Sequence, residues 1–453
     1  MIDKDEAFAR LVRASWERRL ARELDRMVGE SPEADRPRVA FMLAALCGVT
    51  VEASALAGPD FGGRVAAALA SGSGGAPVVA SYGSCANAAC QRREGGPPCV
   101  SSCPFHAIIL DAASGEAKID AEACAGCGRC AEACPDGVFA DLVEYLPAAE
   151  LQRGGRPVIA AVAPAIVGQF GEGATMEKLR AAFKRLGCVD MVEVAFFADM
   201  LTMKEAGEFN EKVMVHDDFL ISSCCCPMWV AMLRRVYKDL VHHVSPSVSP
   251  MIAAGRVLKI LRPGCAVVFI GPCIAKKAEA KEPDLALSID QVLTFHEVKV
   301  IFETAGVDPA SLEGEDSSEY SSRGGRLYAR SGGVSIAVSE AVAELYPAKA
   351  GLFSSAAADG VPACKALLER AKSGELSASF IEGMGCVGGC VGGPKAILPR
   401  EAGRAGVDAY ASGSAIPVAT KSDCMKEILG RLGIFGPEAI MESGKAKLFE
   451  REF

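Results

Sequence analysis

The sequence predicts an α/β fold with mostly parallel sheets flanked by helices, preceded by a small cysteine-rich module and a helical N-terminal region. From residue 156 to about 400, short apolar runs alternate with helical patterns, which is typical of parallel sheets. Eight cysteines lie between Cys85 and Cys134, and an apolar stripe at helical spacing precedes them. We therefore expect three regions, at 1–78, 79–142 and 143–453.

Length and charge narrow the function classes. The chain has 453 residues, half of them hydrophobic, and its net charge is −9. No basic block stands out, so nucleic acid is not an expected partner. The first residues lack a signal core, and Glu52 interrupts the most apolar stretch near them. We expect no membrane association and a cytoplasmic location.

The N-terminal region is expected to be helical. One apolar face is formed by Phe8, Leu11, Val12, Trp16, Leu20 and Leu24, and we expect it to pack on the rest of the chain. Ser31 and Pro32 predict the start of a second helix. The Gly/Ser-rich residues 72–77 predict a loop. At the other end, residues 420–453 look helical and charged.

In the large region, five apolar runs predict buried strands, at 157–164, 192–199, 218–223, 266–272 and 378–385. Helical patterns follow at 176–187 and 227–240. Several of the expected strands run directly into a cysteine motif. In sheets of this kind, sites gather at the carboxyl ends of the strands.

The cysteine block predicts two 4Fe–4S clusters. Clustered thiols in a reducing compartment more often bind metal than form disulfides. The second set reads C-x-x-C-x-x-C-x-x-x-C-P, which is the bacterial ferredoxin run, whereas the first set has stretched spacings and the same ending. The fourth cysteine of each run ligates the other cluster in two-cluster proteins. One cluster is therefore assigned to Cys85, Cys90, Cys99 and Cys134, and the other to Cys124, Cys127, Cys130 and Cys103.

Zinc is the alternative for this block. It favours four-thiolate sites built from two C-x-x-C pairs, and the unbroken run ending in Pro135 argues against it. Five isolated cysteines elsewhere are expected as ordinary core residues: Cys47, Cys188, Cys265, Cys364 and Cys424.

Three further cysteine motifs lie far apart in the large region: SSCCCPMW at 222–229, GPCIAKKAE at 271–279 and EGMGCVGGC at 382–390. Their glycines would let the backbone approach a cofactor closely. In this order, the motifs resemble the signatures of the iron–iron hydrogenases, and the preceding two-cluster module is similar to that family's accessory domain. The resemblance covers most of residues 156–400.

The resemblance implies the FeFe-hydrogenase catalytic fold and the reversible reaction of two protons and two electrons to H2. It implies electron exchange with ferredoxin or a similar soluble carrier, and maturation factors as further partners. The cofactor would be the H-cluster, a 4Fe–4S cube linked through Cys390 to a two-iron site with CO, cyanide and a bridging dithiolate amine. The implied ligands of the cube are Cys226, Cys273, Cys386 and Cys390.

By the same resemblance, Lys276 would hydrogen-bond a cyanide ligand, which suits an ammonium group beside an anion. Its neighbour Lys277 is expected to be solvated. Three other residues would lie close to the two-iron site: Met384, Pro164 and Gly332.

The resemblance also implies a proton relay. Cys225 would stand beside the open iron, and the relay would continue through Glu205, Ser245 and Glu208. Proton transfer needs groups that can both give and take a proton. The two glutamates are three residues apart, so they share one face of a helix.

Some positions depart from the family pattern: Cys224 is an extra thiol, Gly271 stands where methionine is common, Ala165 stands where a small hydroxyl often sits, and Met251 replaces a frequent glutamine. Such changes alter contacts that tune metal sites. Two alternatives therefore stay open, an H2 sensor and a non-catalytic iron–sulfur assembly homologue. A plain electron-transfer subunit would leave the large region unexplained.

Overall fold

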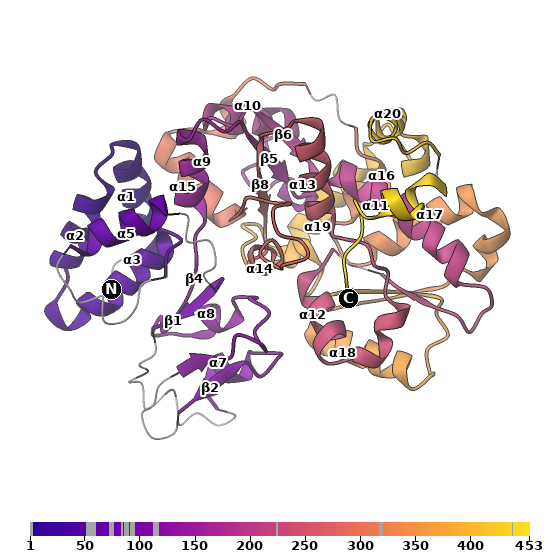
Figure 1. Cartoon of the computed structure of the whole chain (residues 1–453), viewed down its shortest axis with the longest axis horizontal. Helices are drawn as coiled ribbons and strands as arrows, with labels where there is room; N and C mark the ends of the chain where they lie inside the picture. Colours follow the sequence, from indigo (N-terminus) through magenta and orange to yellow (C-terminus); the bar gives the residue numbers. More distant parts are fainter. Residues whose placement is uncertain are drawn as a thin grey trace. The chain divides into compact units, whose positions relative to one another are not determined.

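The computed structural model describes residues 3–50, 60–71, 77–82, 85, 90, 96–111, 117–222, 225–316, 320–436 and 438–453. Within the part of the chain it describes, no helix is long and apolar enough to cross a membrane. The chain divides into two compact units (Figure 1). The first unit comprises Met1–Arg156, Ile274–Lys281 and Gln291–Val307, and the second comprises Pro157–Cys273, Glu282–Asp290 and Asp308–Phe453.

Among its described residues, the first unit begins with the α-helices α1 (Lys4–Trp16), α2 (Leu20–Gly29), α3 (Arg36–Leu46) and α5 (Phe61–Ala70). Asp3 starts α1 by accepting hydrogen bonds from the backbone amides of Asp5 and Glu6. The apolar stripe is divided between α1 and α2, because the chain turns at Arg18 with a φ of 54°. Most of the stripe is buried, whereas Trp16 is 42% exposed.

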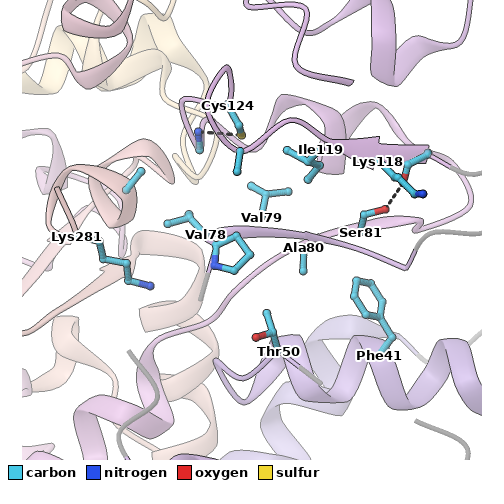
Figure 2. A pocket seen from close by; sticks show the side chains of 15 residues that line it. Phe41, Thr50, Val78, Val79, Ala80, Ser81, Lys118, Ile119, Cys124 and Lys281 are labelled. Atoms are coloured by element: carbon cyan, nitrogen blue, oxygen red, sulfur yellow. Dashed lines mark hydrogen bonds between the residues drawn. The ribbon is translucent and has the colours of Figure 1, made fainter. Parts of the chain in front are cut away.

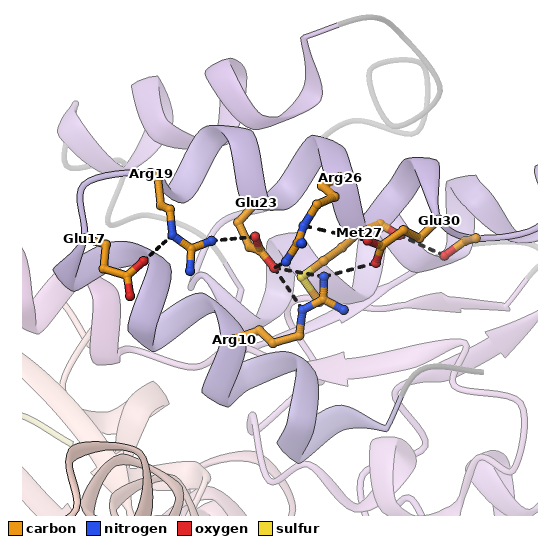
Figure 3. Close-up of polar contacts among 8 residues, drawn as sticks. Arg10, Glu17, Arg19, Glu23, Arg26, Met27 and Glu30 are labelled. Atoms are coloured by element: carbon orange, nitrogen blue, oxygen red, sulfur yellow. Dashed lines mark hydrogen bonds and ion pairs between the residues drawn. The ribbon is translucent and has the colours of Figure 1, made fainter.

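An ion-pair network joins α1 to α2 (Figure 3). The carboxylate of Glu23 is 3% exposed and contacts Arg10, Arg19 and Arg26 at 2.6–2.8 Å. The prediction that Ser31 starts a helix was wrong. Its hydroxyl instead donates to the carbonyl of Met27 at 3.0 Å, so it closes the end of α2, and α3 begins only after a 3-10 turn, η1 (Glu33–Asp35).

The cysteine block of the first unit contains two antiparallel strand pairs. β1 (Val79–Ser81) pairs with β4 (Phe139–Asp141), and β2 (Ile108–Leu110) pairs with β3 (Ala117–Ile119). The short helices α7 (Pro98–Ser101) and α8 (Arg129–Ala133) carry cysteines. The unit is completed by α9 (Tyr145–Arg153), α14 (Ala275–Glu279), β9 (Gln291–Thr294) and α15 (Phe295–Ala305). Of the loop predicted at 72–77, residues 72–76 lie outside the described residues.

In the second unit, β6 (Asp190–Glu193), β5 (Val158–Val162) and β8 (Ala266–Gly271) pair in parallel in that order. The helices α10 (Met176–Arg185) and α13 (Pro250–Leu261) pack against this sheet (Figure 1). The strands predicted at 157–164 and 266–272 are confirmed. The strand predicted at 192–199 is wrong after Glu193, where the helix α11 (Val194–Lys212) begins. A buried helix and a buried strand look alike in a short apolar run.

A second parallel sheet has the order β10 (Ser355–Asp359), β11 (Phe380–Met384) and β7 (Leu220–Ile221). It is contacted by α11, α12 (Pro227–Arg235), α17 (Gly333–Leu345) and α18 (Val361–Lys372), and α16 (Arg323–Leu327) packs against α11 and α17. An apolar cluster fills the space between α11, α17 and β11. The predicted α/β fold with mostly parallel sheets is therefore confirmed.

The remaining segments close the second unit. Two 3-10 turns, η2 (Pro164–Ile166) and η3 (Lys238–His243), follow strands or helices. The helices α19 (Arg400–Ser412), α20 (Asp423–Arg431) and α21 (Ser443–Ala446) come last. Residues 449–451 then lie antiparallel beside residues 246–248, with amide-to-carbonyl distances of 2.8 Å from Val248 to Phe449 and from Arg451 to Pro246.

Candidate functional site

Four cysteines of the second unit lie in segments that follow strands. Cys226 lies after β7 and precedes the first residue of α12. Cys273 comes two residues after β8, and Cys386 and Cys390 follow β11. All three strands belong to parallel sheets, whose carboxyl ends are the usual place for sites. The three motifs therefore lie after parallel strands, where the sequence predicts them.

Backbone contacts bring the loops of these cysteines together. The amide of Gly385 donates to Sγ of Cys226 at 3.2 Å, which joins the β11 loop to the start of α12. The carbonyl of Pro272, just before Cys273, accepts from the amide of Lys395 at 3.0 Å. Pro272 also lies against Gly393, three residues after Cys390, so all three loops meet.

Glycines make this approach possible. A Cβ on Gly383 would lie 2.1 Å from the ring of Trp229, and one on Gly385 would lie 2.5 Å from Cβ of Met228. At Gly389, with a φ of +85°, a Cβ would lie 2.7 Å from Sδ of Met384. Any side chain at these positions would push the loops apart.

The chemistry of these four thiols fits an iron–sulfur cube. A cube binds each thiolate at a different iron atom, so its ligands are farther apart than those of a single metal ion. Sulfur donors on glycine-rich loops are the donor set that iron–sulfur clusters use.

Beside these loops lies an apolar cluster. Cys225 packs against the cluster that contains Met384 and Tyr328, and Met384 is 2% exposed. Pro164, also buried, lies in η2, at the carboxyl end of β5. The backbone amide of Ala163, just before it, donates to the carbonyl of Ile270 in β8 at 2.8 Å. The carboxyl end of this sheet is therefore closed by apolar groups.

The structure describes three of the four positions that depart from the family pattern. A Cβ on Gly271 would lie 2.6 Å from the ring of Phe269, so Phe269 occupies the space that a larger residue there would need. Ala165 and Met251 are both buried. Cys224 lies outside the described residues.

Glu205 is a buried acid next to the cysteine loops. It lies on α11, is 3% exposed, and accepts a hydrogen bond from the hydroxyl of Ser222. Burial, with the nearby charge of Glu208, raises its pKa to about 8, so the carboxyl is mainly protonated at pH 7. Ser222, the first residue of its cysteine motif, was not among the predicted site residues.

Glu208, one helical turn later on α11, is 2% exposed and accepts a hydrogen bond from Lys204. The backbone amide of Ser245 donates to Ile221 of β7 at 2.9 Å, and its hydroxyl accepts from the amide of Ser247 at 3.2 Å. Ser245 is fully buried. The predicted relay residues thus lie on α11 and on the segment next to β7.

Gly332 is held by a carboxylate that the sequence reasoning missed. Glu382 in β11 accepts from the amide of Gly332 at 2.8 Å and from the amide and hydroxyl of Ser335 at 2.8 and 2.7 Å. It therefore caps the N-terminus of α17, where the helix dipole favours an anion. The sequence signal that could have revealed Glu382 is an acidic residue inside an apolar strand.

Cys364, expected as a core residue, is fully buried and lies near Cys226. Its thiol donates to the carbonyls of Met384 at 3.3 Å and Ala358 at 3.5 Å. Burial raises its pKa to about 12. It therefore helps to fix the end of β11, from which the Cys386 loop starts.

Lys276 and Lys277 lie in α14 of the first unit. Lys276 pairs with Glu279, the last residue of its motif, at 2.6 Å. The expectation that Lys277 is solvated was wrong. It is fully buried, donates to the carbonyl of Leu142 at 2.6 Å and pairs with Glu297 at the same distance. Because α14 is buried on both sides, neither Lys276 nor Lys277 is exposed to water.

The eight cysteines between Cys85 and Cys134 fall into two groups. The thiol of Cys99 interacts electrostatically with Cys134, Cys90 and Cys85, and burial together with these neighbours raises its pKa to about 11. The thiol of Cys130 interacts in the same way with Cys127, Cys124 and Cys103. The grouping matches the crossed assignment made from the spacing, while ligation itself stays a prediction.

A cavity of about 820 Å³ opens beside the second group (Figure 2). It is lined by β1, by β3 and by Cys124, whose sulfur accepts from the amide of Gly126 at 3.4 Å. Lys118 and Lys281 are the charged residues of its lining. One predicted cluster ligand is therefore reached from this cavity.

Fold and site together define an iron–sulfur protein with an α/β domain that gathers cysteine loops. The family model for the C-terminal domain of the iron-only hydrogenase large subunit matches residues 156–394. A model for the LdpA Fe–S cluster-binding domain matches residues 88–144. The chain belongs to the iron-only hydrogenase family, an oxidoreductase family, and the resemblance stated from its motifs is confirmed.

Individual hydrogenase subunits also match this chain in sequence. The periplasmic Fe hydrogenase large subunit of Nitratidesulfovibrio vulgaris is 30% identical over 364 residues, which cover 62% of this chain and 86% of the relative. The NADP-reducing hydrogenase subunit HndD of Solidesulfovibrio fructosivorans is 28% identical over 238 residues. That match covers 47% of this chain and only 40% of the relative, so less than half of HndD is represented here.

More partial matches include the cytosolic iron-sulfur assembly component 3 of Mus musculus, 27% identical over 168 residues, or 32% of this chain and 35% of the relative. Among solved structures, FeFe-hydrogenase HydA1 from Chlamydomonas reinhardtii superposes with a TM-score of 0.55 at 22% identity, covering 66% of this chain and 94% of that one. That likeness shows a shared fold.

Proposed function

We propose that this chain is an iron–iron hydrogenase that catalyses the reversible reaction of two protons and two electrons to H2. The observation that carries the proposal is the meeting of three glycine-lined cysteine loops beside Cys225, which packs on the apolar cluster around Met384. Buried acids on α11 stand next to this site. A binding or structural protein would not need that combination.

The residues present fit the H-cluster. Cys226, Cys273, Cys386 and Cys390 would hold its cube, with Cys390 bridging to the two-iron site. When bound, the two-iron site supplies the redox chemistry on hydrogen. Around it would lie Lys276, Met384, Pro164 and Gly332.

The chain's own groups would exclude water and move protons. The apolar cluster keeps the surroundings of Cys225 dry, which strengthens electrostatic interactions there. Glu205 holds a proton near neutral pH because its pKa is about 8, so it can both donate and accept close to the working pH. Ser222 orients its carboxyl. We propose that protons pass between Cys225 and Glu208 through Glu205, with Ser245 on the same path.

Electrons would pass through two accessory 4Fe–4S clusters in the first unit. Their ligands are the two cysteine groups described above. The cavity at Cys124 would bring a carrier close to one of these clusters. Ferredoxin or a similar soluble carrier is the proposed partner, maturation factors would insert the two-iron site, and the cytoplasm is the proposed location.

Infrared spectroscopy of protein matured with the two-iron site tests the proposal. CO and cyanide stretching bands are expected, together with H2 production from a reduced ferredoxin. Cys225→Ala should retain the bands and lose at least about 100-fold in turnover, as expected for removal of a proton-transfer group. Absence of the bands in the parent protein would refute the hydrogenase assignment.

The assembly homologue remains the second candidate, because assembly component 3 matches part of this chain. Such a protein would bind iron–sulfur clusters and show no CO or cyanide bands after maturation. An H2 sensor would show the bands with slow turnover. The same infrared and turnover measurements therefore separate all three functions.

A further inference from the structure

A buried lysine connects the predicted proton relay to the surface. Lys204 lies on α11, directly before Glu205, and its side chain is 0% exposed. Its ammonium group donates to Glu208 and lies 3.3 Å from a carboxylate oxygen of Glu450. Glu208 is 2% exposed, whereas Glu450 is 33% exposed. The three side chains therefore form a continuous line from the interior to water.

The backbone fixes Glu450 in this place. Residues 449–451 lie antiparallel beside residues 246–248, next to Ser245 of the predicted relay. Arg451 holds the same segment by contacting Glu282 and, at 3.6 Å, Asp284. We name residues 449–451 the strap. The strap lies beside the segment that follows Ser245 and supplies Glu450, the partly exposed group of the line.

We propose that Lys204 and Glu450 form the solvent end of the proton path, an inference that rests on the proposed hydrogenase function. The proton leaves Nζ of Lys204 and forms an O–H bond on Glu208, which leaves two neutral groups. Lys204 then takes a proton from Glu450 or from surface water, and its charge is restored. During H2 oxidation, the same steps run in reverse.

Three carboxyl groups face the ammonium group of Lys204, those of Glu205, Glu208 and Glu450. Burial lowers the pKa of Lys204, but the charges and hydrogen bonds of Glu208 and Glu450 outweigh burial and raise that pKa, so the resting ammonium group carries the proton that is passed on. A buried ion pair is expensive to desolvate, so transfer of a proton within the pair costs less than it would between solvated groups. Lys204 contacts two carboxylates of very different exposure, that of Glu208 in the interior and that of Glu450 near water.

Hydrogen–deuterium exchange at Glu205 tests the path without any need for H2 turnover. Glu205 carries a proton at pH 7, and its carboxylic C=O band, assigned by its loss in Glu205→Gln, shifts when that proton is replaced by deuterium. After rapid mixing of the full chain into D2O, Lys204→Met and Lys204→Arg should each slow the exchange at least about 10-fold. Glu450→Gln should also slow the exchange at Glu205. Glu452→Gln, which changes an exposed glutamate just after the strap, should leave the exchange rate unchanged.

Arginine separates transfer from charge neutralisation, because it keeps the positive charge but does not release its proton. Parental exchange in Lys204→Arg or in Lys204→Met would overturn the proposal, as would equal rates in Glu450→Gln and Glu452→Gln. Glu450 is partly exposed, so its variant remains informative if the Lys204 variants do not fold. If the parent protein lacks H2 turnover while exchange still depends on Lys204, the proposed function fails and the path stands.

Discussion

At the scale of single residues, Glu205 makes stability depend on pH. Its pKa lies near 8 in the folded protein against an ordinary value of 4.5, because the side chain is buried. Between these values, the folded state holds a proton that the unfolded state has released. Stability should therefore fall as pH rises through this window, by at most about 1.4 kcal/mol per pH unit from this group.

Glu205→Gln removes this titration, so its free energy of unfolding should depend less steeply on pH between about 5 and 8 than that of the parent. Glu211→Gln changes an exposed glutamate on the same helix and should retain the parental slope. Chemical denaturation at a series of pH values measures both. Equal slopes in the parent and Glu205→Gln would contradict the raised pKa.

Gly383 shows how one missing side chain sets the site. An added Cβ would lie 2.1 Å from the ring of Trp229, which is itself fixed by donation from its indole to the carbonyl of Ser222 at 2.8 Å. We expect Gly383→Ala to destabilise the protein by about 1–3 kcal/mol, as overpacking of a core does. It should also reduce the iron content of the second unit, because Trp229 and Gly383 join two of the cysteine loops.

Thermal unfolding and iron analysis of Gly383→Ala test this. Gly351→Ala is the matched control, since no atom lies within 4 Å of a Cβ there. Both variants lose the same backbone freedom in the unfolded chain, so a difference between them reports the clash. An unchanged melting temperature in Gly383→Ala would show that Trp229 can move.

At the scale of elements, the carboxylate of Glu382 fastens α17 to β11. It accepts three hydrogen bonds at 2.7–2.8 Å from Gly332 and Ser335, and it is fully buried. Glu382→Gln keeps the shape but loses the charge and can no longer accept at both oxygens. We expect a loss of about 1–3 kcal/mol, the usual range for hydrogen bonds to a charged group.

Urea denaturation measures that loss. Glu340→Gln, which changes a less buried carboxylate on α17 itself, is expected to cost less, because Glu340 is paired with Arg323 at the side of the helix. If both substitutions lower the free energy of unfolding by the same amount, the hydrogen bonds of Glu382 at the start of α17 stabilise the protein no more than the ion pair of Glu340 does.

The elements also show what the sequence could and could not reveal. β5, β8 and β11 were predictable because each is a short apolar run with a motif at its end. β10 was not, since its alanine-rich sequence has little strand preference and pairs only through its neighbour β11. The start of α11 was hidden for a related reason, as a helix buried on all sides has no polar face to reveal its period.

The candidate site divides in the same way. Motif register located the cysteines and both glutamates of α11, because their identity and spacing are fixed along the chain. Ser222, Glu382 and Cys364 were missed, since each acts through partners far away in sequence. The burial of Lys277 was missed because its partner Glu297 lies on another helix. Tertiary partners of this kind leave no mark on local spacing.

At the scale of the whole molecule, the cysteine block of the first unit depends on its cysteines for a core. Apolar residues of β1, β2 and β4 pack directly around Cys99 and Cys130, and these strands have only three residues each. A module with so few apolar contacts gains much of its folding free energy from bound metal. Removal of iron should therefore unfold this region before the second unit.

The crossed grouping of the cysteines gives this idea a sharp test. Cys134 follows the second run in sequence but lies with Cys85, Cys90 and Cys99, and Cys103 lies with the other group. Cys134→Ser and Cys99→Ser should therefore weaken the same cluster signal in electron paramagnetic resonance of the reduced protein. Cys103→Ser and Cys130→Ser should weaken the other signal.

Cys188→Ser is the control, because this cysteine of the second unit lies outside every predicted cluster and should leave both signals intact. If Cys134→Ser instead matched Cys130→Ser, each run would hold its own cluster, and the crossing would be wrong. Under the proposed function, the crossing bears on electron flow, because each run would supply its fourth ligand to the other cluster. Two clusters held in this way would be kept at a fixed separation by the cysteines themselves.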